Sequence, residues 1–160
     1  MRFGFQAPKI ALALACIVAT GCTAGAQTPP ADAVNLAISI PTDIKLDRLL
    51  AAGAEQTVSV TAQLTLTNTS AEPVTLQRPN ACQAHTWTAS DSGGNTIDGR
   101  AICSMIFIPV KLSIPAHGTY TGTETVMLRG AKYRDGGHYT LHYTFWGVEV
   151  DAPFATHVVQ

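Results

Sequence analysis

Hydrophobic and polar residues alternate without interruption along residues 57–68, TVSVTAQLTLTN. One face of this stretch carries Val60, Leu64 and Leu66, and the other face carries threonines and Gln63. A period of two residues places successive side chains on opposite faces of a strand, whereas helical spacing would bury the threonines and Gln63. The pattern therefore predicts a half-buried antiparallel strand.

The same alternation recurs along the chain, and turn signals such as NTSAEP, DSGGN and IPAHGT separate its segments. It predicts further strands at residues 34–40, 74–76, 85–90, 106–114, 119–128, 136–146 and 154–159. Pro109 lacks a backbone N–H, so we expect it at a sheet edge or a bulge. Residues 43–53, DIKLDRLLAAG, are the one segment that fits a short helix. We predict an all-β protein, an Ig-like antiparallel β-sandwich of seven or eight strands over residues 34–160, with a β-barrel as the alternative.

The first residues have the features of a secretory signal peptide. Arg2 and Lys9 precede an uncharged apolar run at residues 10–19, and small residues follow this run. The run has about ten residues, whereas a helix that spans a membrane needs about 20. We expect residues 1–21 to be a signal peptide that is removed on export.

The motif ATGC at residues 19–22 resembles a bacterial lipobox, whose cysteine is lipid-modified and becomes the new N-terminus. Ala19 stands where this pattern more often has leucine. Lipidation at Cys22 would make residues 22–33 a flexible tether and the protein an outer-membrane lipoprotein that faces the periplasm. The alternative is cleavage after Ala26, which would give a soluble periplasmic or secreted protein.

Charge and cysteine content narrow the functional classes. The formal net charge is −1, and loss of Arg2 and Lys9 with the signal peptide makes it more negative. Because no basic patch is present, nucleic acid is not expected as a partner. Cys82 and Cys103 lie in the domain, and outside the cytoplasm such a pair usually forms a disulfide, worth about 3 kcal/mol by loop closure. A thiolate metal site or two free thiols are the alternatives.

The sequence lacks the common catalytic motifs. It contains no G-x-S-x-G, no H-E-x-x-H and no glycine-rich phosphate loop. We interpret Asp43 and Asp47, like Glu149 and Asp151, as solvated surface charges. The sequence therefore predicts a protein without enzymatic activity, and no cofactor is expected.

His138 and His142 are four residues apart in the strand predicted at 136–146, and Trp146 follows on the same face. Four residues along a strand span about 13 Å, which is too far for both imidazoles to bind one metal ion. These three residues are therefore a candidate binding surface, in which an exposed Trp146 would anchor a partner. In the alternative interpretation the histidines are scattered surface residues, and Trp146 packs under the C-terminal segment, where Phe154 covers it. A further alternative is a copper site that also gathers other side chains, namely His85, Met105, His117, Met127 and His157.

Three segments share a pattern with a known family: VTAQLTLTNTSAEPVTL, IPAHGTYTGTETV and GGHYTLHYTF. Asn68 and Pro73 frame the turn after the first long strand, and G-x-Y-x-L opens a late strand. Over residues 57–146 the chain resembles the BsuPI type of proteinase-inhibitor domain and the Ig-like segment of some bacterial deuterolysin-type metallopeptidases. The resemblance implies an Ig-like sandwich and, as its most specific function, inhibition of a proteinase by a loop in the Cys82–Cys103 segment.

The sequence as a whole predicts an exported, lipid-anchored binding or adaptor module of the cell envelope. Its expected partners are another envelope protein, such as a protease, and the membrane through the lipid anchor. A periplasmic metal-binding protein and a structural envelope lipoprotein without a dedicated ligand are the alternative functions.

Overall fold

The computed structural model describes residues 33–47, 57–100 and 108–159, and these ranges contain ten β-strands. One sheet has the order β1 (Val34–Ser39), β3 (Thr57–Asn68), β8 (Thr119–Arg129). A larger sheet has the order β2 (Asp43–Asp47), β10 (Val148–Val159), β9 (Gly137–Phe145), β5 (His85–Asp91), β6 (Thr96–Gly99). Strands β4 (Val74–Arg78) and β7 (Val110–Ile114) form a ribbon, and the helical segments are α1 (Ala81–Ala84) and the 3₁₀ turn η1 (Gly130–Lys132).

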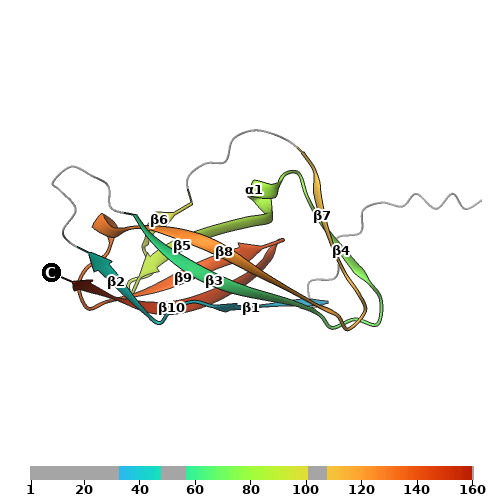
Figure 1. The fold of residues 1–160 in the computed structure, drawn as a ribbon, viewed down its shortest axis with the longest axis horizontal. Helices are drawn as coiled ribbons and strands as arrows, with labels where there is room; N and C mark the ends of the chain where they lie inside the picture. The colour runs from blue at the N-terminus through green and yellow to red at the C-terminus, as the bar shows by residue number, and fades with distance from the viewer. Residues whose placement is uncertain (1–32, 48–56, 101–107, 160) are drawn as a thin grey trace, which may run out of the picture.

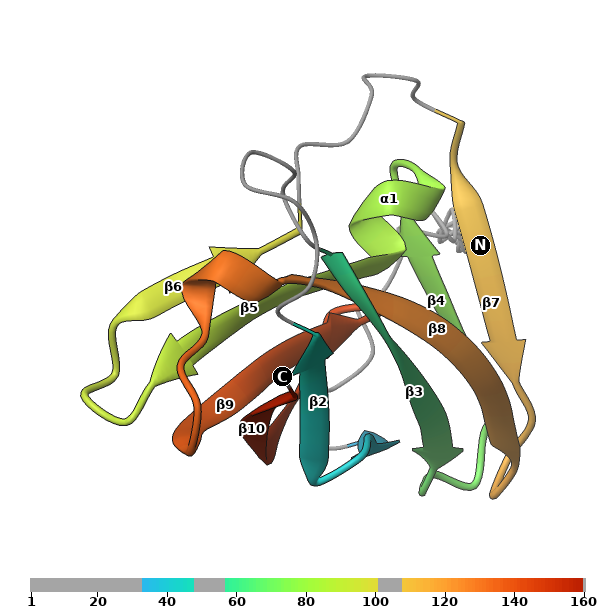
Figure 2. The ribbon, with the colours of Figure 1, turned by 60° about the vertical axis from the view of Figure 1, so that its left-hand side comes forward.

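The three-stranded and five-stranded sheets face each other and enclose the hydrophobic core (Figure 1). The same two layers are visible in the rotated view of Figure 2. The smaller sheet contributes Leu64, Leu66 and Leu128, which are at most 1% exposed. The larger sheet contributes a buried aromatic and aliphatic set, namely Trp87, Tyr139, Leu141, Tyr143, Phe145 and Phe154. The prediction of an all-β sandwich is confirmed.

Strand β3 shows why local alternation was informative. Its even-numbered residues Val60, Ala62, Leu64 and Leu66 are buried, and the odd-numbered residues between them point toward solvent. It pairs antiparallel with both β1 and β8, so it is the central strand of its sheet. A leucine truncated to alanine in such a close-packed layer costs about 2–5 kcal/mol of stability.

The prediction of a short helix at residues 43–53 is wrong over its described part, because residues 43–47 form strand β2. Ile44 and Leu46 are buried, as the strand period requires. Strand β2 pairs parallel with β10, and this pairing is the exception to the predicted antiparallel arrangement. Strand β10 follows β2 by more than a hundred residues along the chain, so the local sequence could not reveal their pairing.

Strands β9 and β10 form a hairpin whose turn is only Trp146 and Gly147, since Phe145 pairs with Val148. Both turn residues have positive φ, 52° and 85°, as a two-residue type I′ turn requires. Glycine adopts this conformation without cost, whereas tryptophan does not. The turn is held from outside, because the Trp146 N–H donates to the Ala84 carbonyl at 2.5 Å and Arg78 Nη2 donates to the Trp146 carbonyl at 2.6 Å.

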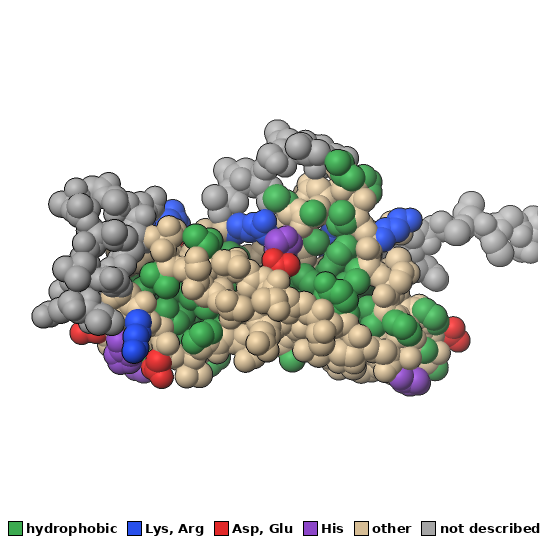
Figure 3. Space-filling view, in the orientation of Figure 1, with side chains coloured by type: hydrophobic (Ala, Val, Ile, Leu, Met, Phe, Trp, Pro, Cys, Tyr) green, Lys and Arg blue, Asp and Glu red, His purple; other side chains and the backbone are tan. Residues whose placement is uncertain are grey.

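Asn68, predicted as a turn residue, ends β3 and is fully buried. Its side-chain NH₂ donates to the carbonyls of Glu72 and Pro115 at 2.8 and 2.9 Å, and its carbonyl accepts from Ser70. The turn before β4 and the turn before β8 are therefore joined by one amide. On the face of the molecule seen in Figure 1, hydrophobic side chains gather over α1 and the β4–β7 ribbon (Figure 3).

Asp98 connects the two sheets on the side where β6 approaches β8. Its side chain has no exposed surface and accepts hydrogen bonds from the Arg129 backbone N–H and Nε, at 2.8 and 2.6 Å. The Tyr133 hydroxyl donates to the same carboxylate at 3.1 Å. A buried carboxylate is tolerated when its charge is paired and its oxygens are hydrogen-bonded, and both conditions hold here.

The N-terminal predictions lie outside the described residues. This applies to the signal peptide at 1–21, to lipidation at Cys22 and to most of the tether at 22–33. Ala33, the last residue of that predicted tether, belongs to the domain, because it is buried and its carbonyl accepts from the Thr69 N–H at 2.9 Å. No helix within the described ranges is long and apolar enough to cross a membrane.

Candidate functional site

The outer face of the five-stranded sheet carries a polar surface. Because β9 buries Tyr139, Leu141, Tyr143 and Phe145, the residues between them face outward. His142 pairs directly with Thr88 of β5 on one side and with Asp151 of β10 on the other. In the next outward row, Thr144 pairs with Thr86 and Glu149. Residues directly opposite in antiparallel strands share a face, so these side chains form one surface.

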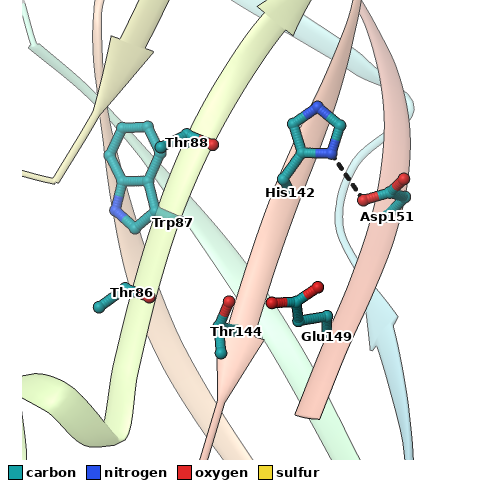
Figure 4. A pocket seen from close by; sticks show the side chains of 7 residues that line it. All are labelled: Thr86, Trp87, Thr88, His142, Thr144, Glu149 and Asp151. Carbon is teal, nitrogen blue, oxygen red and sulfur yellow. Dashed lines mark hydrogen bonds and ion pairs between the residues drawn. The ribbon is translucent and has the colours of Figure 1, made fainter. Parts of the chain in front are cut away.

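This surface contains a shallow hollow of about 410 Å³. The hollow is lined by three threonines, two acidic residues, one histidine and one tryptophan, namely Thr86, Thr88, Thr144, Glu149, Asp151, His142 and Trp87. Figure 4 shows the side chains of His142, Thr144, Glu149 and Asp151 on β9 and β10, beside the threonines of β5. The lining carries two acidic side chains and no lysine or arginine, so the hollow favours cationic groups.

His142 is fixed at the centre of this surface by its two neighbouring strands. Its Nδ1 lies 2.7 Å from Asp151 Oδ1, and its Nε2 lies 2.8 Å from Ser90 Oγ. Because an ionised carboxylate can only accept, Nδ1 carries the proton, and the Nε2 of the neutral ring accepts from the Ser90 hydroxyl. The His142 and Asp151 side chains are 43% and 66% exposed, whereas Ser90 is buried.

His138, the second histidine of the predicted surface, lies in a separate hollow of about 370 Å³. Lys132, Arg134, Asp91 and Asp135 also line this second hollow. Its charges are therefore mixed in sign, unlike those around His142. The structure places both histidines on the outward face of β9, as predicted, but does not bring them into one hollow.

Trp146 does not extend the outward face of β9 as the sequence had indicated. It is a turn residue with positive φ, it is half-buried, and it packs against the core with an edge-to-face contact to Phe145. The two-residue turn at positions 146–147 ends the strand one residue earlier than the alternation predicted. Trp146 is consequently a packing residue and not an exposed anchor.

The structure describes only one of the two cysteines in the predicted disulfide. Cys82 is half-buried in α1, next to Asn80, which caps the helix by accepting from the Gln83 N–H at 2.8 Å. Cys103 lies outside the described residues, so its pairing with Cys82 stays a prediction.

The alternative of a metal site has no cluster to support it within residues 33–47, 57–100 and 108–159, where no three His, Cys, Asp or Glu side chains form a ligand set. The remaining histidines are spread over the fold. His157 lies 3.4 Å from Asp43, and His117 occupies the turn before β8. His85 lies between Glu124 and Arg100, and its pKa is lowered mainly by burial, with Glu124 opposing and Arg100 adding to the shift.

Sequence reasoning missed Ser90, Glu149 and Asp151 as members of this surface. Glu149 and Asp151 were interpreted as isolated solvated charges. The signal that could have found them is the Trp146-Gly147 turn, because a two-residue hairpin that pairs 145 with 148 also pairs 142 with 151.

Comparison with known proteins leaves the activity open. No protein-family model matches the chain, and no curated protein matches its sequence. A structure of β-glucosidase from Listeria innocua in complex with gluconolactone matches at 12% identity and a TM-score of 0.46, over 79% of this chain. Bacteroides uniformis β-glucuronidase 2 matches with a TM-score of 0.38 and 12% identity over 74% of this chain.

The matched regions cover only 16% and 12% of those two glycosidase chains. A structural genomics protein, target SoR45, is covered over 88% of its length, at 13% identity and a TM-score of 0.38. Similarity at this level gives no information on substrate or activity.

Proposed function

We propose that the protein is a binding or adaptor module of the bacterial cell envelope, and that the outer face of its five-stranded sheet around His142 is the recognition surface. The observation that carries this proposal is the hollow of about 410 Å³, in which an oriented imidazole lies beside two carboxylates. The core lies on the opposite face of the same strands, so the residues of the hollow can contact a partner without disturbing the core.

The charge of the hollow indicates the partner's chemistry. Glu149 and Asp151 lie two residues apart on β10, about 7 Å along the strand, and both are exposed. Asp151 uses one oxygen for His142, which leaves its other oxygen for a ligand. A partner protein that presents an arginine or lysine side chain matches this arrangement, because guanidinium and ammonium groups form their strongest hydrogen bonds with carboxylates.

Proteinase inhibition is the more specific form that the family resemblance suggests. The described part of the segment from Cys82 to Cys103 consists of the end of α1, strands β5 and β6 and a turn. In that turn Asp91 Oδ1 accepts from the N–H groups of Gly93 and Asn95. Such a tight turn presents few residues in an extended conformation, so the sheet face is the better candidate surface within the described residues.

A site-specific crosslinking experiment in intact cells tests the proposal. A photo-reactive residue at Thr144, inside the hollow, is compared with the same residue at Gln63, on the outer face of the three-stranded sheet. We expect a discrete adduct from position 144, and a lower yield when Glu149→Gln is added. The matched control Glu72→Gln removes an exposed carboxylate from the turn before β4 and should leave the yield unchanged. Equal capture at positions 144 and 63 would contradict the proposal.

The location proposed for the protein has an independent test. Lipidation at Cys22 predicts that the intact mass of the mature protein includes acyl chains on an N-terminal cysteine. A mature protein that begins with an unmodified Gln27 would show soluble export and remove the membrane anchor from the proposal.

A further inference from the structure

Ser90, His142 and Asp151 form a continuous hydrogen-bonded line across three adjacent strands, β5, β9 and β10. The Ser90 Oγ to His142 Nε2 distance is 2.8 Å, and the His142 Nδ1 to Asp151 Oδ1 distance is 2.7 Å. Each ring nitrogen has the partner it has in a serine-nucleophile triad: Nε2 meets the hydroxyl and Nδ1 meets the carboxylate.

The arrangement fulfils two requirements of nucleophilic catalysis. Asp151 holds the imidazole in the tautomer that leaves the Nε2 lone pair free to accept a proton. The lone pair of Nε2 is within hydrogen-bonding distance of the Ser90 hydroxyl, whose proton must leave for Ser90 to become a nucleophile. We propose that Ser90 is a nucleophile, that His142 is its general base, and that the site acts on small acyl esters.

The size of the acyl group follows from the surroundings of Ser90. Ser90 is only 5% exposed, in contrast to His142, so its surroundings favour a small acyl group. The acyl group is therefore of about acetyl size, and the alcohol portion lies over the hollow beside His142. Thr140 pairs directly with Ser90 in the β5–β9 ladder, and we assign its hydroxyl as the donor that stabilises the developing oxyanion.

The reaction balances without any further reagent except water. Ser90 Oγ attacks the ester carbonyl carbon, its proton moves to His142 Nε2, and the C–O bond to the alcohol breaks while His142 returns the proton to the leaving oxygen. Water then attacks the acyl-serine, His142 takes a proton from that water, and the acid is released as Ser90 regains its proton. Asp151 stays ionised and stabilises the imidazolium in both steps.

This activity goes beyond the proposed binding function. Both activities use His142 and Asp151, but only partner binding uses Glu149 and only ester cleavage uses the Ser90 oxygen. Loss of one therefore leaves the other measurable.

The test incubates the full mature protein with p-nitrophenyl acetate, follows nitrophenolate release and maps the acetyl group by peptide mass spectrometry. We expect acetylation at Ser90, abolished in Ser90→Ala and lowered about a hundredfold or more in His142→Gln. Thr140→Val, which keeps the shape of the side chain, should slow the reaction about tenfold or more. Ser92→Ala, which removes an exposed serine two positions away, should react as the wild type does.

Adduct mapping on the wild-type protein makes the test independent of variant folding. An acetyl group found only on lysines or the N-terminus, or an absence of both an adduct and nitrophenolate release above the buffer rate, overturns the proposal. Acetylation of Ser90 at an equal rate in His142→Gln overturns the role of His142 as the base.

Discussion

Arg78 of β4 occupies the space that a side chain at Gly147 would need. A Cβ placed on Gly147 would overlap Arg78 Nη2, the same nitrogen that donates to the Trp146 carbonyl at 2.6 Å. The ribbon of β4 and β7 is thereby attached to the turn of the β9–β10 hairpin, although the two are far apart in the sequence.

Gly147→Ala should destabilise the fold by about 2–4 kcal/mol, because it combines a strained positive φ with displacement of the Arg78 guanidinium. Gly94→Ala is the matched control, since Gly94 also has positive φ but a Cβ there would meet nothing within 4 Å. We expect about 1 kcal/mol from that change. Urea unfolding of the two variants gives both values, and equal losses would show that Arg78 moves aside without cost.

Asp98→Ala should cost about 3 kcal/mol or more, because it leaves the Tyr133 hydroxyl and the Arg129 N–H without their buried acceptor. Asp43→Asn changes an exposed carboxylate at the opposite edge of the larger sheet, and its effect should stay within about 0.5 kcal/mol. The free energies of unfolding at neutral pH provide the comparison. If Asp98→Ala lowers the free energy of unfolding no more than Asp43→Asn does, Asp98 does not stabilise the contact between the two sheets.

Stability should fall in alkaline solution, beginning near pH 10. Burial raises the pKa of Tyr133 above its ordinary value of 10.0, and Asp98 raises it further. Burial also raises the pKa of Tyr143, with a smaller contribution from Glu124. Because the folded state holds both phenol protons more tightly than the unfolded chain does, this contribution is complete below pH 10 and is lost as the pH rises above it.

Denaturant unfolding measured from about pH 8 to pH 11 tests this expectation. The free energy of unfolding of Tyr143→Phe should decline less steeply with pH than that of the wild type, since one of the two phenols is removed. Identical slopes would show that Tyr143 ionises as readily in the folded protein as in the unfolded chain.

Asn68→Ala should destabilise the protein by about 2–3 kcal/mol, because the Asn68 amide bonds the turns before β4 and β8 at once. Asn35→Ala, at an exposed position on β1, is the control and should change stability by about 0.5 kcal/mol or less. Thermal unfolding followed by circular dichroism separates the two variants. A melting temperature of Asn68→Ala equal to that of the control would contradict the bridging role.

The strands that could be predicted are those whose own residues carry the information. In β3, β5, β8 and β9 one side of each strand faces the core, so hydrophobic and polar residues alternate along the sequence. Strand β2 was mistaken for a helix because its only partner in the sheet is β10, more than a hundred residues later. Strand β6, only Thr96–Gly99, is too short to show a period.

Only part of the surface around His142 could be predicted from the sequence. Alternation placed His138 and His142 on the outward face of β9 correctly, but it cannot supply the register of neighbouring strands. Ser90 and Asp151 reach His142 through the β5–β9 and β9–β10 ladders, and these registers depend on the turns and on packing of the core. The sequence placed Trp146 on the outward face because the alternation continues through residue 146, whereas the turn already begins at that residue.

The position of β10 has a consequence for the order of events during synthesis. Residues 148–159 lie between β2 and β9 in the larger sheet, and they leave the ribosome after all nine other described strands. The nascent chain cannot close its main sheet until those residues are available, so its completion depends on contacts of high sequence separation. Such a chain cannot complete its larger sheet during translation, so its unpaired strands stay accessible to chaperones until synthesis ends.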